Sequence, residues 1–430
     1  MPTMYLEILV ATVLLIAHVP LAVFAVRAWE KGQPPLCIYL VGVSALLYWD
    51  ASICYEALGG KYENQLFNPF FSSSEWTLIL STAVAAFSPW IICAGYWLIG
   101  RRKTPRPSRR MLRLKSPKTF YFAATAISLA VATYSISNLL NFGSIWVARA
   151  VVGAAMGPLV VLLFVPLGIL CFYILMPEAH SAKGKAFCCL LVVCASLSVL
   201  VLGERTGVLL PFLIGGLFYG RASLKRIVVS GLVLLIFAAL VLPLFKWQSA
   251  GATSVEEVLS SAFSGDVARG PILEKSVDLA GATTSRILPY WGSGYVYVLF
   301  YYVPRSIAPF KGTSTGTWFT AAALDSKDDE IGWSLGVGCI EELLLNFGWL
   351  GLVPGLLLIG AAFRLIDSLT VRVPVIGIMA VLAGIWFCGY NLGALVNVFG
   401  SIGIFGAGSQ FLFAKPNGRS PGSAWVAVEV

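Results

Sequence analysis

Apolar stretches of about twenty residues recur along the whole chain, and they limit its possible folds more than any other feature. Such a stretch crosses a lipid bilayer as a helix, because a helix satisfies its own backbone polar groups. Only 12% of the 430 residues are charged, too few to cover a water-facing surface. The chain is therefore predicted to be one all-α, polytopic membrane domain over 1–430, with about eleven (10–12) transmembrane helices. The predicted spans are 5–27, 35–58, 77–99, 119–140, 151–175, 186–203, 207–220, 226–245, 334–362, 373–391 and 396–413.

Positive charge is unevenly divided between the loops. When alternate loops are assigned to opposite sides, 20 of the 30 Lys and Arg residues fall on one side, many of them in 100–118. Because basic loops stay in the cytoplasm, 100–118 is predicted to be a cytoplasmic loop that faces lipid phosphates, not nucleic acid. The N-terminus is then predicted outside the cytoplasmic membrane and the C-terminus inside.

The longest connection between predicted spans, 246–333, is predicted to be a large external (periplasmic) loop with interfacial helices. A connection of more than about fifteen residues is usually functional or disordered. Its aromatic-rich sequence YWGSGYVYVLFYYVPR favours a helix that lies at the headgroup level. A twelfth span at 289–303 is the alternative, and it would reverse the side of everything that follows.

The turn GERTG at 203–207 joins two predicted spans that share only 35 residues. Each helix is then close to the lower length limit, so Glu204 and Arg205 should lie at or just below the outer surface. A charge there is costly unless it is paired or faces a water-filled cavity. One interpretation is a local Glu204–Arg205 pair. We favour an Arg205 that projects into a cavity, because adjacent residues do not face each other along a helix.

Two adjacent carboxylates, Glu341 and Glu342, begin the ninth predicted span in GCIEELLLNFGWLG. Glu342 and Asn346 are four residues apart and therefore share a helix face. One interpretation is that the acids complement the helix dipole; the other is that one of them acts as a general base for a hydroxyl group. Both interpretations stay open, as does the choice between the two acids.

Basic residues between these motifs suggest an anion site: Arg269, Arg286, and the Arg305 and Lys311 of PRSIAPFKG. Arginine binds phosphate in a bidentate manner, while a lysine acts as a point charge. The acidic run DSKDDE at 325–330 is interpreted as a solvated loop and not as a cation site. No histidine is expected outside, so chemistry there is predicted to use neither metal, cofactor nor histidine.

Three of these elements, GERTG, PRSIAPFKG and EELLLNFGWLG, resemble in their order and common side the motifs of O-antigen and oligosaccharide repeat-unit polymerases of the Wzy type. The resemblance covers the second half of the chain in motif and the first half only in hydropathy. It implies a metal-independent glycosyltransferase of the C-type membrane fold. Such enzymes join repeat units carried on undecaprenyl diphosphate at the outer face of the cytoplasmic membrane.

The resemblance implies catalytic roles for Arg205, Arg305 and Glu342. The arginines would stabilise the departing diphosphate, and Glu342, or Glu341, would take the proton of the acceptor hydroxyl. Gly312 stands where family members often have proline, which is a departure. The implied substrate-binding residues are Arg269, Arg286, Lys311, Glu341, Asn346, Tyr290 and Tyr295. For the tyrosines, anchoring of the loop at the membrane surface is the favoured role.

The expected partners are a lipid-linked oligosaccharide and membrane lipids, with a chain-length regulator and a flippase as further candidates and no nucleic acid. An O-antigen ligase is one alternative, but family ligases use an external histidine. A transporter or flippase for the same lipid-linked unit is the other. It would predict internal repeats and charges deep in several spans, where this chain has only Asp50.

Overall fold

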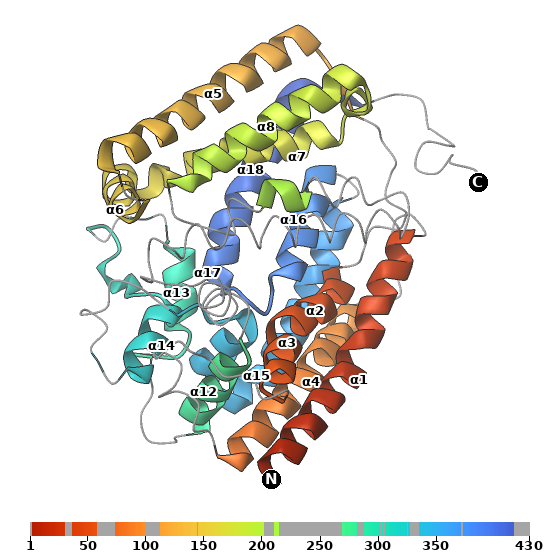
Figure 1. The fold of residues 1–430 in the computed structure, drawn as a ribbon, viewed down its shortest axis with the longest axis vertical. Helices are drawn as coiled ribbons and strands as arrows, with labels where there is room; N and C mark the ends of the chain where they lie inside the picture. The colour runs from red at the N-terminus through yellow and green to blue at the C-terminus, as the bar shows by residue number, and fades with distance from the viewer. Residues whose placement is uncertain are drawn as a thin grey trace.

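The computed structural model describes residues 2–30, 37–57, 74–99, 112–143, 145–201, 210–214, 269–281, 288–301, 303, 306–324, 326, 335–370 and 373–416. These residues are almost entirely helical, as the hydropathy pattern predicts. The helices form two groups that meet in the middle of the molecule (Figure 1). The candidate site described below lies between the groups, and segments that connect the long helices contribute much of its wall.

The first group packs around the pair α4 and α15, at the end that carries the N-terminus in Figure 1. Its helices are α1 (Pro2–Glu30), α2 (Cys37–Ala45), α3 (Ala51–Ala57), α4 (Glu75–Leu98), α12 (Gly270–Gly281) and α15 (Cys339–Thr370). Gly95 and Gly360 lie where α4 and α15 approach most closely, because a Cβ at either one would collide with backbone of the other helix. Small residues allow such close contact between membrane helices.

The second group lies at the opposite end of the molecule (Figure 1). Its helices are α5 (Pro117–Phe142), α6 (Ile145–Met156), α7 (Val165–Ile174), α8 (Ala182–Leu200) and α18 (Ser401–Phe413). A 3₁₀ segment, η3 (Gly157–Phe164), separates α6 from α7, so the predicted span at 151–175 is not one regular helix.

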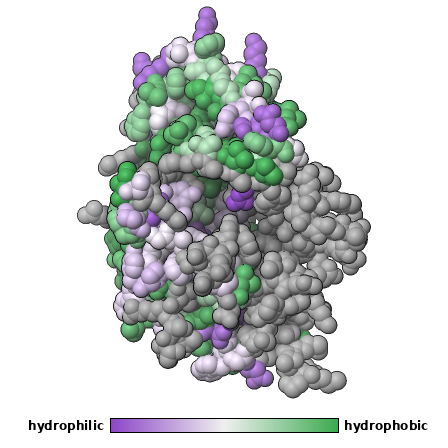
Figure 2. All heavy atoms as spheres, turned by 90° about the vertical axis from the view of Figure 1, so that its left-hand side faces the viewer, coloured by the Kyte–Doolittle hydropathy of each residue, from purple (hydrophilic) through white to green (hydrophobic). Residues whose placement is uncertain are grey.

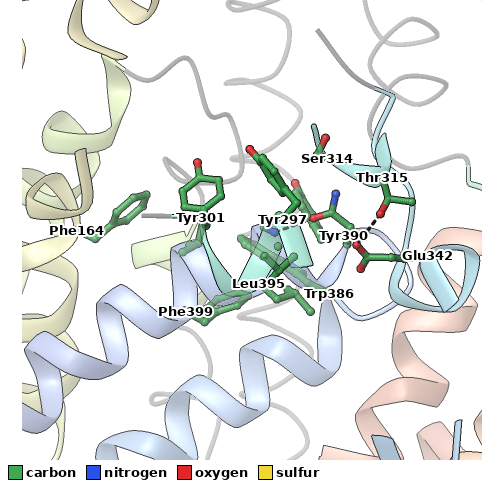
Figure 3. Close-up of a pocket in the computed structure, with 15 residues that line it drawn as sticks. Phe164, Tyr297, Tyr301, Ser314, Thr315, Glu342, Trp386, Tyr390, Leu395 and Phe399 are labelled. Carbon is green, nitrogen blue, oxygen red and sulfur yellow. Dashed lines mark hydrogen bonds between the residues drawn. The ribbon is translucent and has the colours of Figure 1, made fainter. Parts of the chain in front are cut away.

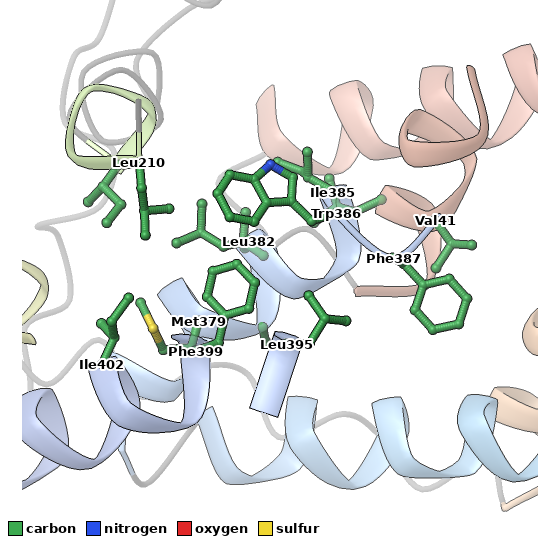
Figure 4. Close-up of a cluster of buried hydrophobic side chains, with 14 of the residues drawn as sticks. Val41, Leu210, Met379, Leu382, Ile385, Trp386, Phe387, Leu395, Phe399 and Ile402 are labelled. Atoms are coloured by element: carbon green, nitrogen blue, oxygen red, sulfur yellow. The ribbon is translucent and has the colours of Figure 1, made fainter. Parts of the chain in front are cut away.

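Helix α16 (Pro374–Ile385) joins the two groups, since it packs against α2 and α15 on one side and α18 on the other. Its side chains Met379, Leu382 and Ile385, with Trp386 and Phe387 just after it, form a buried apolar cluster (Figure 4). The cluster also takes Val41 from α2, Leu210, and Leu395, Phe399 and Ile402 from the last helical segment. Burial of these side chains holds the interface between the groups in place.

Within the part of the chain that the structure describes, six helices are long and apolar enough to cross a membrane: Ile8–Ala25, Glu75–Leu98, Pro117–Phe142, Ala182–Leu200, Cys339–Thr370 and Leu392–Phe413. Three shorter apolar helices, Leu40–Tyr55, Leu159–Ile174 and Pro374–Ile385, fall on three further predicted spans. The predicted spans 207–220 and 226–245 lie outside the described residues except for 210–214. The chain is thus an all-α membrane protein, and the total of eleven spans stays a prediction.

Helix α15 is broken at Gly348, whose φ of 62° and ψ of −165° are not helical. Helix α15 overlaps the predicted span 334–362 but continues to Thr370, and the break divides it into a short first part and a long second part. Hydropathy cannot detect such a break, because a glycine within an apolar run changes the backbone without changing the pattern. As a result, Glu341, Glu342 and Asn346 lie on a short first part of α15, ahead of the long part.

Two of the predicted spans contain a π-helical turn, η1 (Leu46–Asp50) between α2 and α3, and η7 (Val396–Gly400) between α17 (Leu392–Leu395) and α18. In η1 the N–H of Ala51 donates to the carbonyl of Leu46, the wide spacing that defines such a turn. Turns of this kind are rare and are frequent at functional sites. Both border the candidate site described below.

A short antiparallel pair, β1 (Leu112–Leu114) with β2 (Ala414–Pro416), was not predicted, because 100–118 was taken as a loop throughout. The pair sets Arg113 opposite Lys415 and joins the start of α5 to the end of α18. The two segments that charge assigned to one side of the membrane therefore lie together. Which side they face stays a prediction.

The described part of the long segment 246–333 forms α12, α13 (Ser293–Leu299), a 3₁₀ turn η6 (Pro309–Lys311) and α14 (Thr315–Ala323). Helix α13 has seven residues and rises only about 10 Å, which is too short to cross a bilayer. The segment 289–303 therefore does not form a twelfth span. Figure 2 views the side on which α13 and α14 lie: hydrophobic residues cover much of the upper part, and paler or hydrophilic residues are mixed in below.

Candidate functional site

A cavity of about 210 Å³ lies where α13, α14, the first part of α15 and the segment after α16 meet (Figure 3). Much of its wall is aromatic: Phe164, Tyr297, Tyr301, Trp386, Tyr390 and Phe399. The polar side chains Ser314, Thr315 and Glu342 gather at one end, and Asn391 also lines the cavity. The cavity is small for a drug-sized ligand and suits a single small ring with both apolar and polar faces.

Glu342 is the acidic residue of this wall, and its carboxylate is held from two directions. Oε1 accepts a hydrogen bond from Thr315 Oγ1 at 3.1 Å, and Oε2 accepts one from the backbone N–H of Leu392 at 2.7 Å. The side chain is buried, with 1% of the residue exposed. A buried carboxylate needs such donors, and these two fix its orientation towards the cavity.

Asn346 locks the surroundings of Glu342, one helical turn further along α15. Its Nδ2 donates to the carbonyl of Glu342 at 2.7 Å and to Thr315 Oγ1 at 3.3 Å. Its Oδ1 accepts from the N–H of Gly294 at 2.9 Å. The common helix face predicted for Glu342 and Asn346 is confirmed. The amide also connects α13, α14 and α15 in one network.

Gly294 allows this network to be compact, because a Cβ there would collide with Thr315 Oγ1 and lie 2.9 Å from Asn346 Nδ2. Thr315 is the first residue of α14 and follows the N-cap Ser314, whose hydroxyl accepts from the N–H of Thr317. The cap therefore orients the start of α14 so that Thr315 points at Glu342. The sequence shows a Ser/Thr-rich run here, but nothing in it indicates this contact.

Glu341 points away from the cavity and forms a second buried acidic position. Its Oε1 accepts from the indole Nε1 of Trp49 at 3.2 Å, and its Oε2 has no hydrogen-bond partner among the described residues. Arg269 is close enough to act on its charge. The geometry thus distinguishes the two acids: Glu342 lines the cavity and Glu341 does not.

Arg269 begins the segment of α12 and is nearly buried, with 8% exposed. Its Nη1 donates to the carbonyl of Gly336 at 3.1 Å, and its backbone N–H donates to the carbonyl of Tyr48 at 2.9 Å. Nε has no hydrogen-bond partner among the described residues. Arg269 therefore lies outside the cavity wall, in a position from which its charge acts on Glu341.

Lys311 is buried at the end of α13, where its ammonium donates to three backbone carbonyls. The acceptors are Phe300 at 3.3 Å, Tyr301 at 3.2 Å and Val303 at 2.6 Å. These bonds complete carbonyls that the helix end leaves free. Lys311 thus stabilises the segments that surround the cavity. Because its ammonium already donates to backbone carbonyls, it would act on a bound anion through its positive charge more than through hydrogen bonds.

The two tyrosines predicted to bind substrate do not line the cavity. Tyr290 is exposed, and its hydroxyl donates to the carbonyl of Phe310 at 3.3 Å. Tyr295 stacks on Phe347 at a centroid distance of 5.4 Å, and burial together with the charge of Glu342 raises its pKa, so its hydroxyl stays neutral. The tyrosines in the wall are instead Tyr297, Tyr301 and Tyr390. The hydroxyls of Tyr297 and Tyr301 point to the same side as Ser314 in Figure 3.

Three predicted arginines, Arg205, Arg286 and Arg305, lie outside the described residues, so their roles stay predictions. Among the described residues, no group of three His, Cys, Asp or Glu side chains is placed to hold a metal ion. The structure adds Thr315, Trp386 and Tyr390, which sequence reasoning missed. The rings of Trp386 and Tyr390 stack with their centroids 5.2 Å apart, in a turn that the hydropathy pattern places at the end of a predicted span.

Comparisons with protein-family models, curated proteins and solved structures give no match. Fold and site together define an all-α membrane protein in which a fixed carboxylate closes one end of an aromatic cavity.

Proposed function

We propose that this protein is a membrane glycosyltransferase that polymerises lipid-linked oligosaccharide repeat units for a surface polysaccharide. It would act at the external face of the cytoplasmic membrane, on units carried by undecaprenyl diphosphate. The observation that carries the proposal is the buried carboxylate of Glu342 in the wall of a cavity lined by aromatic side chains. Sugars combine apolar ring faces with hydroxyl groups, and this wall offers complements to both.

In the proposed reaction, a hydroxyl oxygen of the acceptor sugar forms a bond to the anomeric carbon of the donor chain. The bond from that carbon to the diphosphate oxygen breaks, and the diphosphate lipid leaves with the bonding electrons. Glu342 takes the proton of the hydroxyl. Both its oxygens keep a lone pair free beyond the bonds from Thr315 and Leu392, so the carboxylate can still accept.

Charge on the departing diphosphate needs cationic groups, and the resemblance assigns Arg205 and Arg305 to this task, with Arg286 as a further candidate. Arg269 and Lys311 would add positive potential from behind, since neither is in the cavity wall. Glu341 would set the local charge and leave proton transfer to Glu342. This division of roles follows from Glu342 lining the cavity.

The test is a polymerisation assay with the purified protein in liposomes that contain a lipid-linked repeat unit. Wild-type protein should give a ladder of products. Glu342→Gln should insert normally and elongate about 100-fold more slowly or worse, because it removes the proton acceptor and keeps the shape. The matched control is Glu75→Gln, the same change at an exposed acid that begins α4. An undiminished ladder from Glu342→Gln would contradict the role of this residue, and transport of the lipid without any ladder would favour a flippase.

A further inference from the structure

A buried histidine–aspartate pair lies in the first group of helices, away from the cavity. His18 of α1 is fully buried and contacts Asp50, whose exposed fraction is 1%. The ring nitrogen Nδ1 lies 2.9 Å from Oδ1 and 3.0 Å from Oδ2 of Asp50. The other nitrogen, Nε2, lies 3.0 Å from the carbonyl oxygen of Ala85 in α4. The pair thus connects α1, η1 and α4 at one point.

The protonation of this pair follows from its acceptors. A backbone carbonyl oxygen only accepts, so Nε2 of His18 must carry a hydrogen. Nδ1 faces a carboxyl group, and a proton lies between the two whether it belongs to the ring or to the acid. Ionisable pairs of this kind are rare inside membrane helices, because burying them is costly. Packing alone would be served as well by apolar side chains.

Asp50 is the last residue of the π-turn η1, and the other residues of that turn reach the candidate site. Trp49 donates its indole N–H to Glu341, and the carbonyl of Tyr48 accepts the N–H of Arg269. The hydroxyl of Ser52, just after the turn, donates to the carbonyl of Trp49 and accepts the N–H of Gly270. One turn therefore sets both the indole beside Glu341 and the start of α12.

We propose that His18 and Asp50 form a positioning pair, which holds the π-turn so that Trp49 stays hydrogen-bonded to Glu341 and Arg269 stays in place at the start of α12. A π-turn has an extra residue compared with an α-helical turn, and it persists only where its surroundings hold it. The bond from Asp50 to His18 anchors the turn on α1 and α4. The hydrogen bonds of Tyr48 and Trp49 then fix the position of the turn relative to α12 and α15. The effect of the pair on turnover rests on the proposed function, while its effect on the position of Trp49 does not.

The first experiment reports on geometry alone. Protein labelled with 5-fluorotryptophan is examined by ¹⁹F NMR, and Trp49→Phe identifies the Trp49 resonance among the 13 tryptophans. His18→Gln and Asp50→Asn should both shift or broaden that resonance. The double variant should do no more than either single change, because the pair acts as a unit. Tyr96→Phe is the matched control: it removes a partly buried hydrogen bond to Asp367 and one from Arg364, both towards the far end of α15, and should leave the resonance in place.

The second experiment keeps the pair intact, in case the variants do not fold. With His180→Gln as the background, ¹⁵N-histidine reports on His18 alone, since the chain has two histidines. A protonated Nε2 and a strongly hydrogen-bonded Nδ1 are expected. A nitrogen spectrum with a free, unprotonated Nε2, or an unmoved Trp49 resonance in the folded variants, would overturn the proposal.

Turnover separates this proposal from the proposed function. In a protein that makes ladders, His18→Gln and Asp50→Asn should lower kcat up to about 100-fold with little change in KM, because the acceptor wall is untouched. If the wild-type protein makes no ladder but the variants still move the Trp49 resonance, the proposed polymerase function is rejected and the structural role of the pair is retained. Normal kcat with a moved resonance would show that the pair does not serve the reaction, which would overturn its predicted effect on turnover.

Discussion

Asn346→Ala offers the clearest test of how the site is held together. The bond from Asn346 to the carbonyl four residues earlier also occurs at Asn138, but without bonds to other helices, so the two asparagines can be compared. The change removes three hydrogen bonds, from Nδ2 to Glu342 and Thr315 and from Gly294 to Oδ1. The N–H of Gly294 is left buried without its acceptor, which costs about 1–3 kcal/mol, and the lost bond to Thr315 adds about 1 kcal/mol. We expect the free energy of unfolding to fall on the order of 2–4 kcal/mol.

The matched control is Asn138→Ala in α5. Asn138 donates to the carbonyl of Tyr134 at 2.8 Å, the same spacing of four residues as Asn346 and Glu342, but near the surface. This variant should change stability by no more than about 0.5 kcal/mol. Unfolding in mixed detergent micelles, followed by circular dichroism, measures both. If Asn346→Ala is as stable as Asn138→Ala, the network around Glu342 does not hold the site together, and the reasoning fails.

Two further changes test the frame of the cavity. Lys311→Met should lower the free energy of unfolding by on the order of 2 kcal/mol or more, because three carbonyls lose a charged donor; Lys275→Met, which removes only an exposed pair on one helix, should cost about 0.5 kcal/mol or less in the same melts. Gly294→Ala should cost about 1–3 kcal/mol and reduce elongation, because its Cβ has no room. Gly281→Ala, with open space around its Cβ, should change stability by less than about 1 kcal/mol; equal effects of the two alanines would show that the close approach at Gly294 is not required.

The different surroundings of the adjacent acids also explain how a pair of glutamates can be kept in an apolar setting. Each has its own donor: Thr315 and the N–H of Leu392 for Glu342, and Trp49 for Glu341. Two carboxylates that shared one cavity would repel each other. Because neighbouring residues on a helix point in different directions, Glu341 and Glu342 extend from one helical turn into two different environments.

The pattern of apolar stretches by itself determined the all-α membrane class, and the described spans follow it closely. Spacing along one helix was enough to place Glu342 and Asn346 on a common face. Both inferences depend on contacts within a few residues, where backbone geometry is regular and sequence distance translates directly into space.

Only the tertiary structure decided which acid lines the cavity, where α15 breaks, and what surrounds Glu342. Trp49 and Glu341 are separated by 292 positions in the chain, and Thr315 and Glu342 by 27. Such contacts depend on how whole helices pack, and no local pattern encodes them. The break at Gly348 escapes prediction for a related reason: it is a choice of backbone angle that glycine permits and that packing around the residue selects.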